Sequence, residues 1–175
     1  PALSLTALPG EGGVRTRKIA ILVANGVEGA SVQALQTALA DAGAVPLLVA
    51  PRLGKVTAAD GTVLEAQASM ENTPPVLFDA MVLPDGEDAV SLLSRVGYTD
   101  EFIKNQYRHC KTILVLGASS KLTEKMGINP TLPTGETDPG LLFADASAID
   151  AAAQQFIDAV SPHRHPARGM GPPLI

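Results

Sequence analysis

The chain is poor in cysteine and aromatic residues. Among its 175 residues there is one cysteine, Cys110, no tryptophan, and an aromatic content of only 3%. A single cysteine excludes an internal disulfide and every metal site of the Cys-x-x-Cys type. With so few aromatic side chains the core must consist mainly of Ala, Val, Leu and Ile, which is typical of helices packed on a parallel sheet.

The sequence also lacks long apolar and long basic runs. No stretch approaches the roughly 18 consecutive apolar residues of a membrane-spanning helix, so we expect no membrane partner. The formal net charge is -5, which argues against nucleic acid as a partner, although residues 163–168 are locally basic. The first residues show no signal peptide and nothing requires an oxidising compartment, so we expect a cytoplasmic location.

Proline and glycine are concentrated at the two ends of the chain. The sequence opens on Pro1 without an initiator Met, and Pro9, Gly10, Gly12 and Gly13 precede the first regular pattern. We expect a fragment in which residues 1–16 are a linker from an upstream domain and residues 17–160 form a single α/β domain. Residues 161–175 contain four prolines and are predicted to be an extended tail.

Apolar runs alternate with amphipathic segments along residues 17–160. The expected strands are 18–24, 45–51, 80–83, 112–116 and 141–143, and the expected helices are 30–42, 87–94, 99–110, 120–126 and 147–160. This alternation predicts a flavodoxin-like three-layer sandwich: a mostly parallel sheet with helices on both faces. The Asp60-Gly61 pair predicts a small β-hairpin beside the sheet. Four positions are expected to supply helix caps: Ser31, Thr99, Ser119 or Ser120, and Ser147.

In such a sheet, ligands bind beyond the carboxyl ends of the strands, so the loops at 25–31, 84–87 and 117–120 are the ones to test. A dinucleotide-binding loop requires Gly-x-Gly-x-x-Gly after the first strand, and Gly26 and Gly29 have the wrong spacing. A flavin-type phosphate loop would need more Ser and Thr than Ser31 alone. A phospho-acceptor site would need Asp85 together with an acidic pair after the first strand, where only Glu28 is present.

The segment "TILVLGASSKL" predicts a sharp strand-to-helix turn, the elbow at which many hydrolytic enzymes expose a Cys or Ser nucleophile. Here the strand ends in Val115 and Leu116, which cannot attack a substrate. Cys110 precedes the strand and is expected to be a small buried residue at a helix end. Ser119 and Ser120 are expected to cap the following helix. The residues therefore predict an elbow without a nucleophile.

The remaining polar residues do not supply a catalytic centre. His163 and His165 lie in the Pro-rich tail and are expected to be solvated, and His109 stands near a helix C-terminus, where a cation is favourable. Three carboxylates flank a loop and lack a second group with which to form an acid/base pair: Glu136, Asp138 and Asp145. Tyr98 and Tyr107 are expected to be packing residues. We therefore predict no catalytic residue, no metal site and no cofactor site in this chain.

Four segments carry a resemblance to a known family: "NGVEGAS", the hairpin "GKVTAADGTVL", "DAMVLPDG" and "TILVLGASSKLTEKMGIN". In this order they resemble the DJ-1/PfpI group of the class I glutamine-amidotransferase-like fold over about residues 17–160. Active members carry a Cys two residues before the elbow glycine and an acidic residue after the first strand. By this resemblance those places are Val115 and Ser31, and the usual Gly-Gly after the third strand is Asp85-Gly86.

The resemblance implies a vestigial pocket rather than an active site. Because both functional groups are missing, we expect no protease, deglycase or glyoxalase activity. The residues expected to surround the pocket are Asn25, Ser31, Asp85, Gly86, Val115, Leu116, Gly117 and Ser119.

One branch is especially similar, the C-terminal domain of large-subunit haem catalases, on the strength of the opening "PALSL" and of the hairpin. This resemblance implies a parent enzyme that decomposes hydrogen peroxide as a homotetramer, with its haem bound upstream. The chain is then expected to be a non-catalytic domain that contributes stability and assembly. Its partners would be the upstream catalase core and the neighbouring subunits.

Two alternatives from other functional classes remain open. The first is a chaperone-like module of the DJ-1/PfpI type that binds unfolded protein clients through exposed apolar tail residues, namely Met170, Leu174 and Ile175. The second is a residual small-molecule enzyme or thiol sensor that uses Cys110.

Overall fold

The computed structural model describes residues 13–170 and shows one α/β sandwich. The central sheet has six parallel strands in the order β5-β2-β1-β6-β7-β8. Its strands are β1 (Lys18–Leu22), β2 (Val45–Ala50), β5 (Ala68–Ser69), β6 (Ala80–Leu83), β7 (Thr112–Leu116) and β8 (Leu141–Ala144). The helices are α1 (Gly29–Asp41), α2 (Glu87–Leu93), α3 (Gly97–Arg108), α4 (Ser120–Lys125) and α5 (Ile149–Val160).

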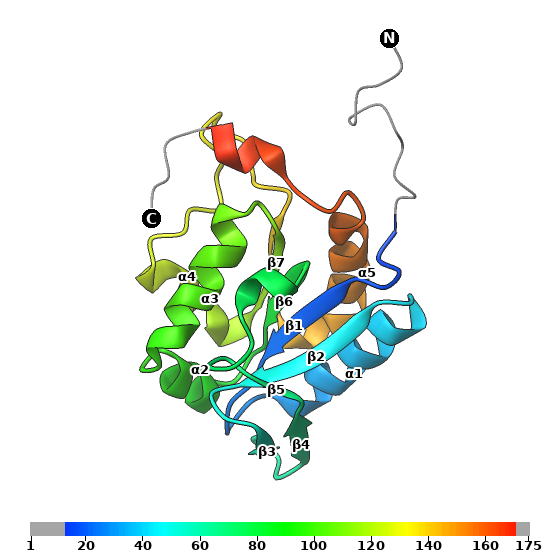
Figure 1. The fold of residues 1–175 in the computed structure, drawn as a ribbon, viewed down its shortest axis with the longest axis vertical. Coiled ribbons are helices and arrows are strands. Elements are labelled where there is room, and N and C mark those ends of the chain that lie inside the picture. The colour runs from blue at the N-terminus through cyan, green and yellow to red at the C-terminus, as the bar shows by residue number, and fades with distance from the viewer. Residues whose placement is uncertain (1–12, 171–175) are drawn as a thin grey trace.

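The helices form a layer on each face of the sheet. Helices α1 and α5 pack against each other on one face, and α2, α3 and α4 lie on the other (Figure 1). The central strands are buried between the two layers, and every residue of β6 and of β7 is buried. Continuous apolar runs are what parallel strands covered on both faces require, and the predicted fold class is confirmed.

The predicted hairpin is also confirmed. Strands β3 (Gly54–Thr57) and β4 (Val63–Ala66) pair in antiparallel register around a turn that contains Gly61, whose φ is 87°. The side-chain oxygen of Asn25 accepts the N–H of Thr57 at 2.9 Å, and the N–H of Gly26 donates to the Thr57 carbonyl at 2.9 Å. The hairpin is therefore fixed against the loop between β1 and α1.

The predicted helix caps are wrong. Helix α1 is capped by Glu28, whose carboxylate accepts the N–H groups of Ala30 at 3.2 Å and Ser31 at 2.8 Å, while Ser31 lies inside the first turn. Thr99 is buried inside α3, and the hydroxyl of Ser119 donates to the carbonyl of Pro84. The other two expected capping serines, Ser120 and Ser147, make no capping bond either. Tertiary contacts thus determine where these polar side chains bind.

The described part of the C-terminal segment is not extended. Residues Pro166–Met170 form a 3-10 helix, and the side chains of His165 and Arg168 are buried. This segment folds back over the end of the sheet at which β7 begins (Figure 1). We call residues 161–170 the C-terminal strap. Two expectations lie outside the described residues. One is the linker, of which only residues 13–16 are described. The other is the exposed apolar tail, since Leu174, Ile175 and the side chain of Met170 are not described.

Candidate functional site

The elbow lies where β7 meets α4. The strand ends at Leu116, Gly117 adopts a φ of 51°, and a single 3-10 turn (Gly117–Ser119) leads into the helix. Val115 stands two residues before Gly117 and is only 1% exposed. An alkyl side chain has neither a proton to lose nor a lone pair with which to attack. The elbow geometry is therefore present, and the position two residues before its glycine holds no nucleophile.

The second strand-end loop, residues 84–86, contacts this elbow directly. The Oδ1 atom of Asp85 accepts the N–H of its neighbour Gly86 at 2.8 Å and the N–H of Ala118 at 2.8 Å. The backbone carbonyl of Asp85 also accepts the N–H of Glu28 at 2.9 Å. Asp85 thus joins the loops that follow β1, β6 and β7.

The place expected for a supporting acid holds Ser31, which is 2% exposed. Its hydroxyl donates to the carboxylate of Glu28, the residue that caps α1. The carboxylate of Glu28 already accepts two backbone N–H groups and this hydroxyl, so α1 itself uses most of its acceptor positions. The carboxylate of Glu28 therefore lies near the expected place, but it caps the N-terminus of α1.

An open cavity of about 310 Å³ lies beside the elbow, and it shares only part of the predicted lining. Val115 and Gly117 line it as expected. The other lining residues come from the start of α4 and from the end of β8 and were not predicted for this pocket: Ser120, Phe143, Ala144 and Asp145. Sequence reasoning missed Phe143, Ala144 and Asp145 because it assigned no ligand loop to the short strand at 141–143.

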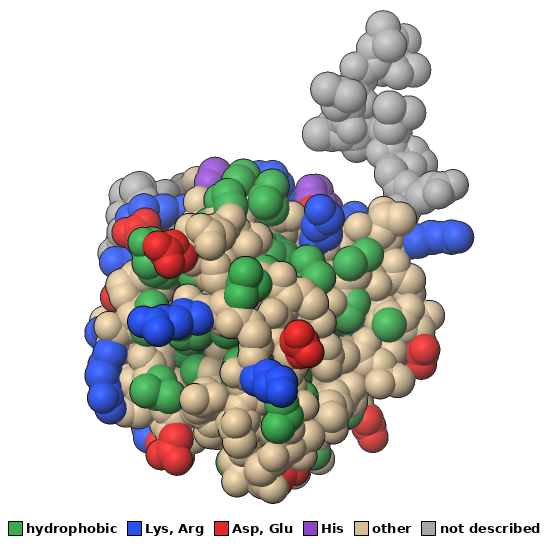
Figure 2. All heavy atoms as spheres, turned by 60° about the horizontal axis from the view of Figure 1, so that its bottom comes forward, with side chains coloured by type: hydrophobic (Ala, Val, Ile, Leu, Met, Phe, Trp, Pro, Cys, Tyr) green, Lys and Arg blue, Asp and Glu red, His purple; other side chains and the backbone are tan. Residues whose placement is uncertain are grey.

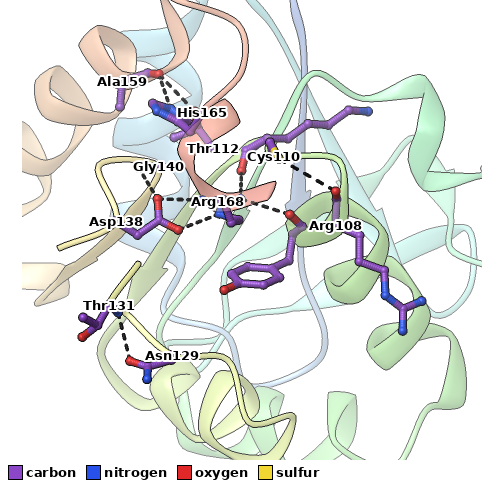
Figure 3. Close-up of polar contacts among 12 residues, drawn as sticks. Arg108, Cys110, Thr112, Asn129, Thr131, Asp138, Gly140, Ala159, His165 and Arg168 are labelled. Carbon is purple, nitrogen blue, oxygen red and sulfur yellow. Dashed lines mark hydrogen bonds and ion pairs between the residues drawn. The ribbon is translucent and has the colours of Figure 1, made fainter. Parts of the chain in front are cut away.

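A second polar cluster lies at the opposite end of the sheet, where Arg168 of the strap is inserted between Asp138 and the end of α3 (Figure 3). Its Nε and Nη2 donate to the two carboxylate oxygens of Asp138 at 2.6 and 3.1 Å, and both side chains are almost fully buried. Its Nη1 donates to the carbonyls of Lys111 at 2.7 Å and Tyr107 at 3.3 Å. The guanidinium also lies 4.7 Å from the centre of the Tyr107 ring. Asp138 is thus held in a buried ion pair.

His165, in the middle of the strap, contacts α5 and β7 (Figure 3). Its backbone N–H donates to the carbonyl of Cys110 at 2.8 Å, and its Nε2 lies 2.9 Å from the carbonyl of Ala159 and 3.0 Å from the Thr112 hydroxyl. Burial, reinforced by the nearby Arg168 charge, lowers the pKa of His165 despite the bond to Ala159. The expectation of a solvated histidine is wrong because the strap packs against β7.

Other single residues differ from expectation in their exposure. Cys110 is partly exposed rather than buried and has a φ of 58° just after α3, with its Sγ 3.9 Å from the carbonyl of Arg108. Tyr98 is 52% exposed and is not a packing residue. His163 is half-buried, with its Nδ1 3.9 Å from a carboxylate oxygen of Asp79.

Residues 13–170 offer neither a metal-binding cluster nor a membrane-spanning helix. Within this range no group of three or more His, Cys, Asp or Glu residues is placed to hold a metal ion. No helix described there is both long enough and apolar enough to cross a membrane.

Comparison with solved structures supports the fold. A DJ-1 superfamily protein of Salmonella typhimurium superposes with a TM-score of 0.74 at 17% identity, over 88% of this chain and 95% of that protein. DJ-1beta of Drosophila melanogaster gives a TM-score of 0.74 at 13% identity, over 83% and 91% of the two chains. At such low identities the likeness concerns the DJ-1-like fold alone.

Comparison with curated proteins gives relatives of higher identity. Catalase HPII of Pseudomonas putida is 39% identical over 165 residues, which are 94% of this chain but 21% of the relative. Catalase C of Rhizobium meliloti is 37% identical over 119 residues, 68% of this chain and 17% of the relative. The chain thus spans about a fifth of the length of these relatives.

A family model described as the C-terminal domain found in long catalases matches residues 15–170. This range contains the elbow, the hairpin and the C-terminal strap, which is the whole of the described sandwich except its first two residues. The chain belongs to this family of catalase C-terminal domains.

Proposed function

We propose that this chain is a non-catalytic domain of a long, haem-containing catalase and that it contributes to the stability and assembly of that enzyme. The observation that carries the proposal is the elbow. Its nucleophile position holds the buried alkyl side chain of Val115, and its neighbouring N–H groups already bind Asp85. An intact fold whose elbow lacks a nucleophile is what we expect of a domain that acts through its contacts with the rest of the enzyme.

The chemistry of peroxide decomposition belongs, in this proposal, to the part of the parent that precedes the domain. Haem iron in proteins is held by an axial His, Cys, Met or Tyr side chain. In the described chain, Tyr107 lies beneath the Arg168 guanidinium and the Nε2 of His165 is committed to Ala159 and Thr112. The half-buried Tyr107 and the buried His165 are thus engaged in contacts within the domain.

Contacts with the catalase core and with neighbouring subunits would stabilise the parent by mass action, because they exist only in the folded assembly. Hydrophobic side chains are scattered among polar ones on the face shown in Figure 2 and do not form one continuous patch. Within residues 13–169, the most exposed of the large hydrophobic residues are Leu53, Val63, Val76, Leu77 and Tyr98. We therefore expect a mixed interface, as is common between domains of one chain.

No contact among the described residues supports either of the two alternative functions. The chaperone-like reading depended on Met170, Leu174 and Ile175, whose side chains are outside the described part. The thiol-sensor reading depends on Cys110, whose Sγ contacts only the carbonyl of Arg108 among the hydrogen bonds of the described residues.

Deletion of the domain from the full-length enzyme tests the proposal. We expect the truncated enzyme to lose activity faster on heating and to assemble less completely, while peroxide turnover per bound haem stays nearly unchanged. The measurements are inactivation half-life, mass by light scattering, and initial rate normalised to haem absorbance. A truncated enzyme with unchanged heat resistance and assembly would refute the stabilising role.

A matched variant separates the domain's fold from its mere presence. Arg168→Leu in the full-length enzyme leaves the chain length intact but removes the buried ion pair with Asp138. We expect it to shift heat resistance in the same direction as the deletion. Lys121→Met, at an exposed ion pair with Glu87, should leave heat resistance unchanged.

A further inference from the structure

The carboxylate of Asp85 occupies the elbow as a ligand would. Its Oδ1 accepts the N–H groups of Gly86 and Ala118, both at 2.8 Å, and these donors come from two different strand-end loops. Hydrogen bonds from N–H groups to an ionised acceptor are roughly twice as strong as those between neutral groups. The elbow thus contains a small two-donor cradle, and the protein's own side chain fills it.

The sheet register brings the carboxylate to this place. Leu83 of β6 pairs with Val115 of β7, so that two residues further along each chain Asp85 reaches Gly117. A Cβ atom added to Gly117 would overlap the Asp85 carboxylate. Gly117 must therefore lack a side chain for the carboxylate to lie against the elbow backbone.

Gly86 closes the other side of the cradle. Its φ of 133° is a conformation that side-chain-bearing residues rarely adopt, and an added Cβ would lie 2.9 Å from the Cα of Val27. Gly86 thus packs directly against the loop after β1 while its N–H donates to Asp85. The cradle is thus formed by backbone that only glycine permits at two positions.

Backbone N–H groups at a strand-to-helix elbow are the donors that stabilise an oxyanion in enzymes built on such a turn. In this chain the donors of Gly86 and Ala118 converge on a single carboxylate oxygen. An external anion could use them only after Asp85 had left.

We propose that Asp85 is a built-in ligand that closes an anion-binding cradle at the elbow, and that the empty cradle would accept a small carboxylate. The inference deepens the proposed function, because it supplies a second reason why the elbow is inert. It can fail separately, since it makes no statement about the parent enzyme.

Chemical rescue tests this inference. Asp85→Ala removes the carboxylate, and because the φ of Asp85 is not positive an alanine needs no backbone change. We expect a lower melting temperature for Asp85→Ala in sodium chloride. Sodium formate at the same ionic strength should raise it saturably, by about 2–4 °C for a chain of this size.

Two controls isolate the cradle from general salt effects. The unchanged protein and Asp85→Asn, whose amide oxygen can still accept both N–H groups, should melt at the same temperature in formate and in chloride. An equal response of all three proteins to formate would overturn the proposal. So would a melting temperature of Asp85→Ala that formate does not change.

A second measurement covers poor folding of the variant. Amide hydrogen exchange of Ala118 should be slow in the unchanged protein, faster in Asp85→Ala in chloride, and slowed again by formate. If Asp85→Ala folds only when formate is present, the proposal is supported. If it stays unfolded in formate while Asp85→Asn folds, a free carboxylate does not replace the side chain and the proposal is wrong.

Discussion

Removal of the Arg168 guanidinium is the most informative perturbation of stability. Arg168→Leu deletes four hydrogen bonds, two to the carboxylate of Asp138 and one each to the carbonyls of Lys111 and Tyr107. It leaves Asp138, which is 1% exposed, as a buried charge whose remaining bond is from the Gly140 N–H at 2.8 Å.

The expected magnitude follows from that uncompensated charge. Breaking one partner of a buried ion pair typically costs about 3–5 kcal/mol, and a domain has about 5–15 kcal/mol of stability in total. We therefore expect Arg168→Leu to lower the free energy of unfolding by about 3–5 kcal/mol, which would leave some molecules unfolded at room temperature if the chain is marginally stable.

Urea denaturation followed by far-UV circular dichroism measures the effect. The control is Lys121→Met. The ion pair of Lys121 with Glu87 is 2.7 Å long, against 2.6 Å for Arg168 with Asp138, but its side chains are exposed. Exposed pairs contribute at most about 1 kcal/mol. The double variant Arg168→Met with Asp138→Leu should be more stable than Arg168→Leu, since it removes both charges together. A loss below about 1 kcal/mol for Arg168→Leu would refute the reasoning.

Three further predictions concern the strap and its neighbours. The pKa of His165 is lowered in the folded state. The contribution of the neutral imidazole to stability should therefore be fully present above the ordinary histidine pKa of about 6.5 and should be lost as the pH falls below it. The unfolding midpoint of His165→Gln should depend less on pH between 7.5 and 5 than that of the unchanged protein. Gly140→Ala should destabilise the chain by about 2 kcal/mol or more, because its Cβ would overlap the His165 ring, whereas Gly97→Ala has open space around the new methyl group and should be neutral or slightly stabilising in thermal melts. Cys110 has a φ of 58°, so Cys110→Gly should leave the melting temperature equal or raise it, and Cys110→Ala should cost no more than about 1–2 kcal/mol. A loss of activity of the full-length enzyme at an unchanged melting temperature would contradict a purely structural role.

Local sequence patterns were sufficient for most of the sandwich. The continuous apolar runs at 18–22 and 112–116 identify strands that are covered on both faces, because only such strands need no polar side. The Asp60-Gly61 pair was sufficient to predict the hairpin, because the geometry of a tight turn depends on adjacent residues. Strand β5 was missed because two residues contain no periodic signal. The absence of a nucleophile at Val115 was likewise visible in the sequence alone.

The uses of the polar side chains were decided only by the tertiary structure. The sequence places Asp138 and Arg168 thirty residues apart, and nothing local indicates that a Pro-rich segment returns to bury them together. Asp85 looks like an ordinary turn residue until parallel pairing of β6 with β7 brings it against Gly117. Backbone periodicity is a local property, whereas a buried polar group binds whichever partner the packed chain brings within hydrogen-bonding distance. For that reason the fold was predictable and the contents of the elbow and of the strap were not.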